Sequence, residues 1–148
     1  MPNISFNTPI GNLSLTECNN SITKLSWALD NTPESTRLLI SGKDQLLAYF
    51  SGELKSFTLP LNPTGTAFQK EVWNHIQSIP IGTTRTYGWL FGLTSSSPRA
   101  IGGACGRNPI PILIPCHRIT SRTGLGGYSG AGGALTKKFL LRLEQTSR

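Results

Sequence analysis

The stretch Ile110-Pro111-Ile112-Leu113-Ile114-Pro115-Cys116-His117-Arg118 ends an apolar run with a thiol and an imidazole side by side. A cysteine on a stiff, buried, strand-like segment is usually inert, because burial raises its pKa above the ordinary value of about 8.5. A neighbouring histidine supplies a base that can take the thiol proton, directly or through a water. Whether Cys116 packs the core or acts as a nucleophile therefore decides the function of the chain.

Length and cysteine usage narrow the class of protein. The 148 residues suffice for one good core or two small ones. No apolar run reaches the length of about 18 residues that a membrane span needs, and residues 1–5 do not resemble a secretory signal. Three cysteines without a pairing framework favour free thiols in a reducing compartment. We expect a cytoplasmic protein without membrane contact, associated with the nucleoid if its source is bacterial.

Positive charge is concentrated in the second half of the chain. Residues 1–64 carry four Lys and Arg against five acidic residues, whereas residues 65–148 carry ten against two. The formal net charge of +7 therefore comes from the second half. Such a distribution fits a partner that is a polyanion, and a merely soluble basic surface is the alternative.

The first half predicts a mixture of strands and one helix. Alternating apolar residues indicate strands around residues 13–15 and 25–29, and a further strand over residues 57–61. Residues 46–50 before Gly52 are typical of a helix with a glycine C-cap. Acids, histidines and cysteines form no cluster here, so we expect structural support from this half.

A linker at residues 61–65 separates a support domain, residues 1–61, from a second domain, residues 65–148. Thr66 and Gln69 predict a capping box for the first helix of the second domain. Two shorter helices are expected over residues 87–93 and 98–105, the latter capped by Ser97 with Pro98 at its first position. This pair is a helix-turn-helix candidate, although many domains that do not bind DNA contain similar pairs.

The second of these helices has one face almost without side chains. Ala100, Gly103 and Ala104 are spaced to share that face. Tight packing against another helix is the commoner explanation. The alternative is insertion into a narrow groove of DNA, with Arg99 beside the smooth face as a probe.

A catalytic histidine works better when a third group orients it. The second half has two carboxylates, Glu71 and Glu144, and Glu144 ends an amphipathic helix that residues 139–143 would anchor to the core. Glu144 is therefore the candidate partner of His117, although an exposed glutamate near a frayed end is the commoner case.

Two further segments flank the Cys-His pair. Asn108, just before Pro109, is placed to brace the loop through backbone hydrogen bonds. Six glycines within residues 124–133 surround Tyr128 and Ser129, which would cover a planar substrate if the loop is not simply a solvated linker.

Taken together, these stretches resemble the O6-alkylguanine-DNA alkyltransferase family, the methylated-DNA–protein-cysteine methyltransferases. The similarity covers about residues 65–145 and is looser over residues 1–60. The matching blocks are Thr86-Tyr87-Gly88, Pro98 to Ala104, Asn108 to Arg118, Gly127-Tyr128-Ser129-Gly130 and Lys137 to Glu144. The block from Asn108 to Arg118 is highly specific for this family.

The resemblance implies an α/β, ribonuclease-H-like N-terminal domain and a mostly α, winged-helix-like C-terminal domain with a helix-turn-helix. It implies single-turnover DNA repair: O6-alkylguanine, and O4-alkylthymine as a second candidate, is flipped from the duplex and loses its alkyl group irreversibly to the protein's own cysteine. The partner implied is double-stranded DNA bound through its minor groove by a monomer, with no cofactor. Some relatives bind zinc in the first domain, but Cys18 alone, with no histidine in residues 1–60, makes no such site.

The resemblance also assigns roles. Cys116 is implied as the alkyl acceptor, and His117 as its water-mediated base. Glu144 would orient His117, and Asn108 would brace the turn. Tyr87 would assist nucleotide rotation and donate a proton to the purine, while Arg99 would replace the flipped base in the stack. Pocket or DNA contacts are implied for Ala100, Gly103, Ala104, Arg107, Tyr128, Ser129 and Lys137.

Trp89 and Phe91 depart from the polar or small residues usual in the family, and the segment 129–136 is about two residues longer. A DNA-lesion sensor without enzymatic activity is the runner-up, and Cys116 argues against it. A Cys-His-Asn hydrolase is a third hypothesis, but such enzymes usually have His and Asn distant in sequence and an oxyanion hole, which nothing here indicates.

Overall fold

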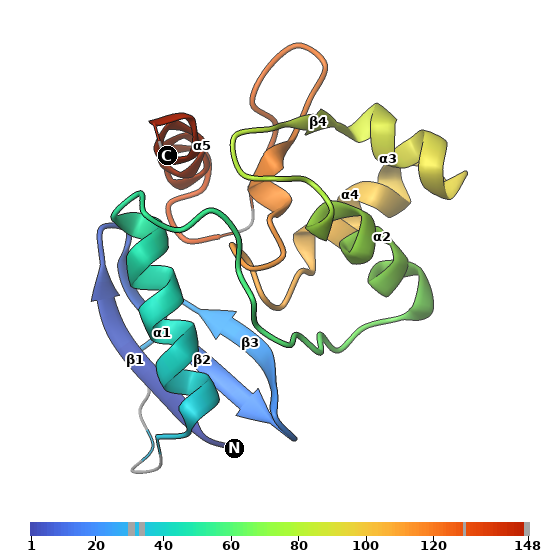
Figure 1. Ribbon diagram of the computed structural model, residues 1–148. Helices are drawn as coiled ribbons and strands as arrows, with labels where there is room; N and C mark the ends of the chain where they lie inside the picture. Colours follow the sequence, from blue (N-terminus) through green and yellow to red (C-terminus); the bar gives the residue numbers. More distant parts are fainter. Residues whose placement is uncertain (30–31, 33–34, 129, 147–148) are drawn as a thin grey trace.

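The protein was analysed as a computed structural model that describes residues 1–29, 32, 35–128 and 130–146. A small sheet covered by one helix is followed by a mostly helical unit, which confirms the expected fold class (Figure 1). Among the described residues, no helix is both long and apolar enough to cross a membrane.

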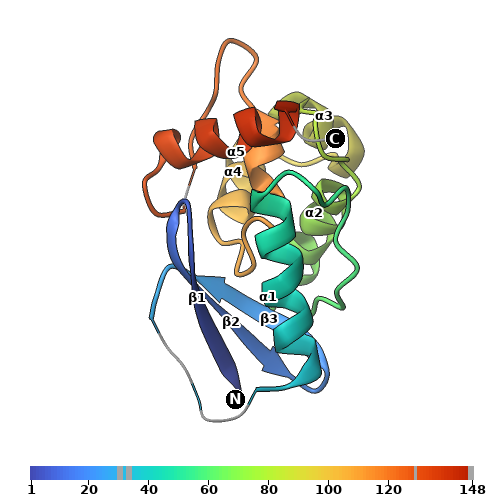
Figure 2. The same ribbon diagram turned by 60° about the vertical axis from the view of Figure 1, so that its left-hand side comes forward.

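The N-terminal unit is built on a three-stranded antiparallel sheet. Its strands, in spatial order, are β1 (Asn3–Thr8), β2 (Gly11–Cys18) and β3 (Ser21–Ser26). The turn between β2 and β3 places Asn19 and Asn20 at positive φ, which asparagine tolerates better than most residues. Helix α1 (Arg37–Phe50) lies across one face of the sheet (Figure 2).

Apolar alternation explains how the sheet packs on the helix. Leu13 and Leu15 of β2 and Leu25 of β3 are buried in the core, as the pattern predicts. Leu39 and Leu46 of α1 are buried in the same core. The helix and the sheet therefore cover each other's apolar face.

Two strand predictions in this unit were wrong. Residues 57–61, all of which the structure describes, form no strand and make only one parallel bridge, from Leu61 to Ile22. The strand expected over residues 25–29 ends before Leu29, which is 74% exposed. The glycine cap is confirmed, because Gly52 follows α1 with a φ of +83°.

The C-terminal unit is mostly helical. Its helices are α2 (Ala67–Gln77), α3 (Tyr87–Thr94), α4 (Pro98–Gly106) and α5 (Ala134–Thr146), with a 3-10 turn η1 (Cys116–Arg118). The short strands β4 (Arg85–Thr86) and β5 (Ile119–Thr120) pair in parallel. The capping box of Thr66 and Gln69 and the cap at Ser97 are both confirmed.

Helix α5 packs beside η1 and brings its buried face to the Cys-His pair. Leu140 is buried and Leu143 is half-buried, as expected of anchors. Phe139 was expected to anchor as well, but 39% of it is exposed. The buried face of α5 instead includes the polar residues Lys137 and Glu144.

Candidate active site

The apolar run before Cys116 folds into a tight turn, and the expectation of a strand there was wrong. The amide of Ile114 donates to the carbonyl of Ile110 (2.8 Å), and the amide of Cys116 donates to the carbonyl of Ile114 (2.8 Å). Ile112 adopts a φ of +74°, a conformation that a β-branched residue rarely takes. Such a conformation persists only where the surrounding structure holds it, and Ile112 is fully buried.

Asn108 holds both ends of this turn. Its side-chain oxygen accepts from the amide of Ile110 (2.9 Å), and its Nδ2 donates to the carbonyl of Ile114 (2.8 Å). The same Nδ2 lies 3.3 Å from Sγ of Cys116. The side chain expected to brace the loop therefore also touches the thiol.

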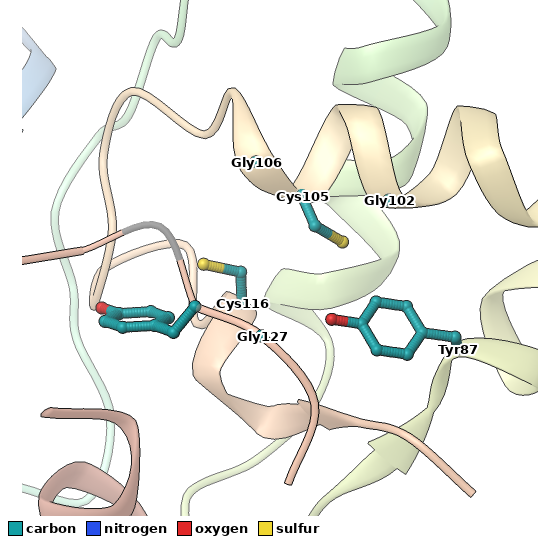
Figure 3. Close-up of a pocket in the computed structure, with 7 residues that line it drawn as sticks. Tyr87, Gly102, Cys105, Gly106, Cys116 and Gly127 are labelled. Carbon is teal, nitrogen blue, oxygen red and sulfur yellow. The ribbon is translucent and has the colours of Figure 1, made fainter. Parts of the chain in front are cut away.

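Cys116 faces a cavity of about 320 Å³. The cavity is lined by Tyr87, Gly102, Cys105, Gly106, Cys116, Gly127 and Tyr128. Figure 3 shows the Tyr87 hydroxyl directed toward the side on which the Cys105 and Cys116 side chains lie. Sequence reasoning did not identify Cys105 as a second thiol in this pocket.

His117 lies behind the turn with no exposed surface. Its Nε2 is 2.5 Å from Oε2 of Glu144, which confirms that the two side chains meet. Arg118 adds two bonds to the same carboxylate, from Nε to Oε1 (2.8 Å) and from Nη2 to Oε2 (3.0 Å). Its Nη1 donates to the carbonyl of Ile79 (2.7 Å). The sequence had given no role to Arg118.

The carboxylate of Glu144 is ionised in this setting. Burial alone would raise its pKa, but the hydrogen bonds and charges of His117 and Arg118 lower that pKa to about 2. An ionised carboxylate only accepts, so His117 donates through Nε2 and keeps the lone pair on Nδ1. Nδ1 has no hydrogen-bond partner among the described residues.

Opposing effects act on the acid and the base of the pair. Burial lowers the pKa of His117, against the hydrogen bond and charge of Glu144, so the imidazole is neutral and able to take a proton. Burial raises the pKa of the Cys116 thiol, while the Asn108 hydrogen bond and the positive charge of Lys137 lower it. The thiol therefore needs its neighbours to become a nucleophile.

Lys137 is fully buried and ties two segments together. Its Nζ donates to the carbonyls of Ile119 (2.6 Å) and Gly127 (2.9 Å). It therefore fixes the pocket wall at Gly127, as expected of a residue near that wall, and brings a positive charge close to Cys116.

Two tyrosines complete the pocket. Tyr87 is half-buried at the start of α3, where burial, and then repulsion from Cys105 and Cys116 in their ionised forms, raise its pKa and keep it a proton donor. The Tyr128 hydroxyl is buried without a hydrogen-bond partner among the described residues, and burial raises its pKa. Ser129, which was expected beside it, lies outside the described residues.

The smooth surface of α4 differs from the one that spacing predicted. Ala104 was expected on it but is only 2% exposed, and its carbonyl accepts from Nε1 of Trp73 (2.9 Å). Helix packing, which was the commoner explanation, is correct for this residue. The exposed residues of α4 and its C-cap are Pro98, Arg99, Ala100, Gly102, Gly103, Gly106 and Arg107.

The two unusual aromatic residues of α3 lie at its surface. Trp89 is half-buried, with the guanidinium carbon of Arg85 5.7 Å from its ring centroid. Phe91 is partly exposed. Phe91 therefore does not fill the core, and Trp89 does so only in part.

The N-terminal unit contributes one polar side chain to this site. The hydroxyl of Tyr49, on α1, donates to Oε2 of Glu144 (2.6 Å). No local sequence signal marks Tyr49, which reads as an ordinary core aromatic. The first half of the chain, which was expected to give structural support, therefore also supplies a side chain that contacts Glu144.

Two family models together match most of the chain. Residues 3–63 match the 6-O-methylguanine DNA methyltransferase, ribonuclease-like domain, and residues 67–146 match the 6-O-methylguanine DNA methyltransferase, DNA binding domain. Among curated relatives, the methylated-DNA–protein-cysteine methyltransferase of Methanosarcina acetivorans is 49% identical over 78% of this chain and 74% of its own length. The constitutive enzyme of that name from Bacillus subtilis is 38% identical over 95% and 93%.

Solved structures give the same result. The crystal structure of Mycobacterium tuberculosis O6-methylguanine methyltransferase is 37% identical and has a TM-score of 0.85, over 99% of this chain and 94% of that one. A Mycobacterium tuberculosis structure in complex with DNA is 36% identical, with the same TM-score and coverage. The chain therefore belongs to the 6-O-methylguanine DNA methyltransferases, a family of DNA-binding repair enzymes, as its sequence motifs predicted.

Proposed function

We propose that the protein repairs O6-alkylguanine in double-stranded DNA by transferring the alkyl group irreversibly to Cys116. One observation carries this proposal: the Cys116 thiol faces a pocket, touches the Asn108 amide and is followed by a histidine held by a buried carboxylate. O4-alkylthymine is a second candidate substrate.

The chemistry follows from these contacts. Nδ1 of His117 takes the thiol proton through a water, and Glu144 stabilises the imidazolium that forms. The thiolate attacks the alkyl carbon, a C–S bond forms, and the C–O6 electron pair returns to the guanine. The hydroxyl of Tyr87 supplies a proton to the purine ring, so that a neutral base leaves. The product is a thioether, which leaves no free thiol on Cys116 for a second turnover.

The exposed face of α4 supports a minor-groove contact, and the proposal assigns this contact to a monomer. Gly102 and Gly103 have open space where a side chain would begin, so the helix backbone can approach a groove wall closely. Arg99 projects from the same helix and would fill the stack after the alkylated base rotates into the pocket. DNA repair of this kind takes place in the compartment that holds the DNA, which is the cytoplasm or the nucleoid.

The proposal also divides the chain into two domains, residues 1–61 and residues 65–148.

A peptide assay tests the acceptor directly. Trypsin cleaves after Arg99, Arg107 and Arg118, which puts the two pocket thiols in different peptides, residues 100–107 and 108–118. After incubation with a duplex that contains O6-methylguanine, we expect one added methyl group in peptide 108–118 and a restored guanine.

Cys105→Ala is the matched control for this assay. Burial raises the pKa of Cys105 to about 12, so its loss should leave the transfer intact. Cys116→Ala should abolish it. An unmodified peptide 108–118 with the lesion still present would contradict the proposal, and retained DNA binding would then favour a lesion sensor.

A further inference from the structure

The bond from Tyr49 to Glu144 joins the two units of the fold at the site. The two residues are 95 positions apart, and Tyr49 is 1% exposed. Because Glu144 is ionised, the tyrosine hydroxyl is the donor. Burial, and then the negative charge of Glu144, raise the pKa of Tyr49, so the hydroxyl keeps its proton.

Tyr49 and His117 share one acceptor atom. Oε2 of Glu144 accepts from the Tyr49 hydroxyl, from Nε2 of His117 and from Nη2 of Arg118. Donors to one oxygen compete for its electron density, so each hydrogen bond weakens the pull of the carboxylate on the others. The tyrosine hydroxyl therefore moderates how strongly Glu144 favours a proton on the imidazole.

Besides Tyr49, charged and titratable side chains from three elements surround the carboxylate. Arg118 on η1 is a cation in direct contact, Lys137 on α5 is a second cation near the imidazole, and Tyr128 adds a weak acid from the loop. Tyr49 on α1 carries no charge and donates a hydrogen bond directly to Glu144. Removing its hydroxyl changes one hydrogen bond and leaves every charge in place.

We propose that Tyr49 is a positioning residue for alkyl transfer, whose hydroxyl fixes Oε2 of Glu144 and sets the proton affinity of His117. The inference deepens the proposed function and rests on it only where Cys116 reactivity is concerned. It gives the N-terminal unit a part in the chemistry.

Loss of the Tyr49 hydroxyl should shift the protonation of the His117–Glu144 pair in one direction. Without Tyr49 the negative charge on Glu144 is less stabilised, so the His117–Glu144 pair takes up a proton at higher pH. A proton on Nδ1 of His117 prevents it from accepting the thiol proton. The rate of Cys116 methylation should fall at low pH, and this fall is the acid limb of its pH profile. In Tyr49→Phe the acid limb should therefore move to higher pH, by about one unit.

Nuclear magnetic resonance of the full chain with ¹⁵N-labelled histidine measures the effect apart from catalysis. The chain has two histidines, and His75 on α2, which is partly exposed, is an internal reference. We expect the Nδ1 signal of His117 to titrate at higher pH in Tyr49→Phe than in the parent protein, with His75 unchanged.

Phe57→Leu is the control for disturbed packing. The Phe57 ring centroid lies 5.3 Å from that of Tyr49, so the substitution perturbs the same aromatic cluster and keeps the hydroxyl. It should lower stability and leave the His117 titration and the acid limb where they are.

Two outcomes overturn the inference. In one, the His117 titration and the acid limb are each the same in Tyr49→Phe as in the parent protein. This includes the case in which the imidazole stays neutral in both proteins. The other is an equal shift in Phe57→Leu. Failure of the proposed function looks different: peptide 108–118 is then unmethylated in the parent protein, and the histidine spectra still report on Tyr49.

Discussion

The side-chain amide of Asn108 lies 3.3 Å from Sγ of Cys116 and donates to the carbonyl of Ile114 at 2.8 Å. One side chain thus fixes the turn and contacts the sulfur. A thiolate gains more from this donor than a thiol does, so the contact lowers the pKa of Cys116 against the effect of burial.

Asn108→Ala should slow the alkylation of Cys116 at neutral pH by tenfold or more. Loss of the amide raises the thiol pKa, and each unit lowers the thiolate fraction about tenfold. The rate of methylation against pH checks this, with Asn74→Ala, on the exposed face of α2, as the control. Equal rates in Asn108→Ala and the parent protein at neutral pH would remove the asparagine from the chemistry.

Arg99→Ala should impair repair of duplex DNA much more than alkyl transfer from the free base. The free base needs no rotation out of a stack, so it does not need a side chain to replace it. Lys70→Ala removes the same charge from an exposed position on α2 and should affect both substrates little. Parallel losses on the two substrates in Arg99→Ala would count against the stacking role.

Gly103→Ala should raise the stability of the protein and lower its affinity for DNA. A Cβ at this position meets nothing within 4 Å, so the helix gains up to about 1 kcal/mol from the better helix former. The same methyl group keeps the α4 backbone away from the groove, and DNA affinity should fall. Thermal unfolding and fluorescence anisotropy measure the two effects.

Gly92→Ala on α3 is the matched glycine control, because its added Cβ also meets nothing within 4 Å. It should raise stability in the same way and leave affinity largely unchanged. Undiminished affinity in Gly103→Ala would show that α4 does not approach DNA closely.

The stabilising contribution of Glu144 should be lost as the solution becomes acidic. Its folded-state pKa of about 2 lies below the usual value, so its contribution is fully present above pH 4.5 and is lost as pH falls toward 2. Urea unfolding of the parent protein and of Glu144→Gln between pH 6 and pH 3 should show a flatter dependence in the variant. Glu71→Gln, which changes the exposed second carboxylate of this half, should keep the parental slope.

Local signals in the sequence predicted local structure well. The capping box at Thr66 and the cap at Ser97 depend on residues three positions away, and both occur as expected. The pairing of His117 with Glu144 was predicted because the second half offers only two carboxylates.

Relationships that depend on tertiary packing were missed. Spacing placed Ala104 on a face with Ala100 and Gly103 but did not show that Ala104 is buried, with its carbonyl accepting a hydrogen bond from Trp73. The apolar run before Cys116 fits a strand by composition, and the turn depends on Asn108 and an unusual φ at Ile112. Tyr49 gave no signal, since its partner lies 95 residues away.

The order in which the chain is synthesised gives that last contact a further consequence. A ribosome makes α1, then Cys116 and His117, and only later the helix that carries Glu144. Contacts so distant in sequence close late in folding. Before α5 has been made and docked, His117 lacks the carboxylate of Glu144 that orients it. The Cys116 thiol of the nascent chain should therefore react slowly with electrophiles. If the proposed function holds, Cys116 becomes reactive only when α5 docks, and this order of events protects an acceptor that each molecule uses once.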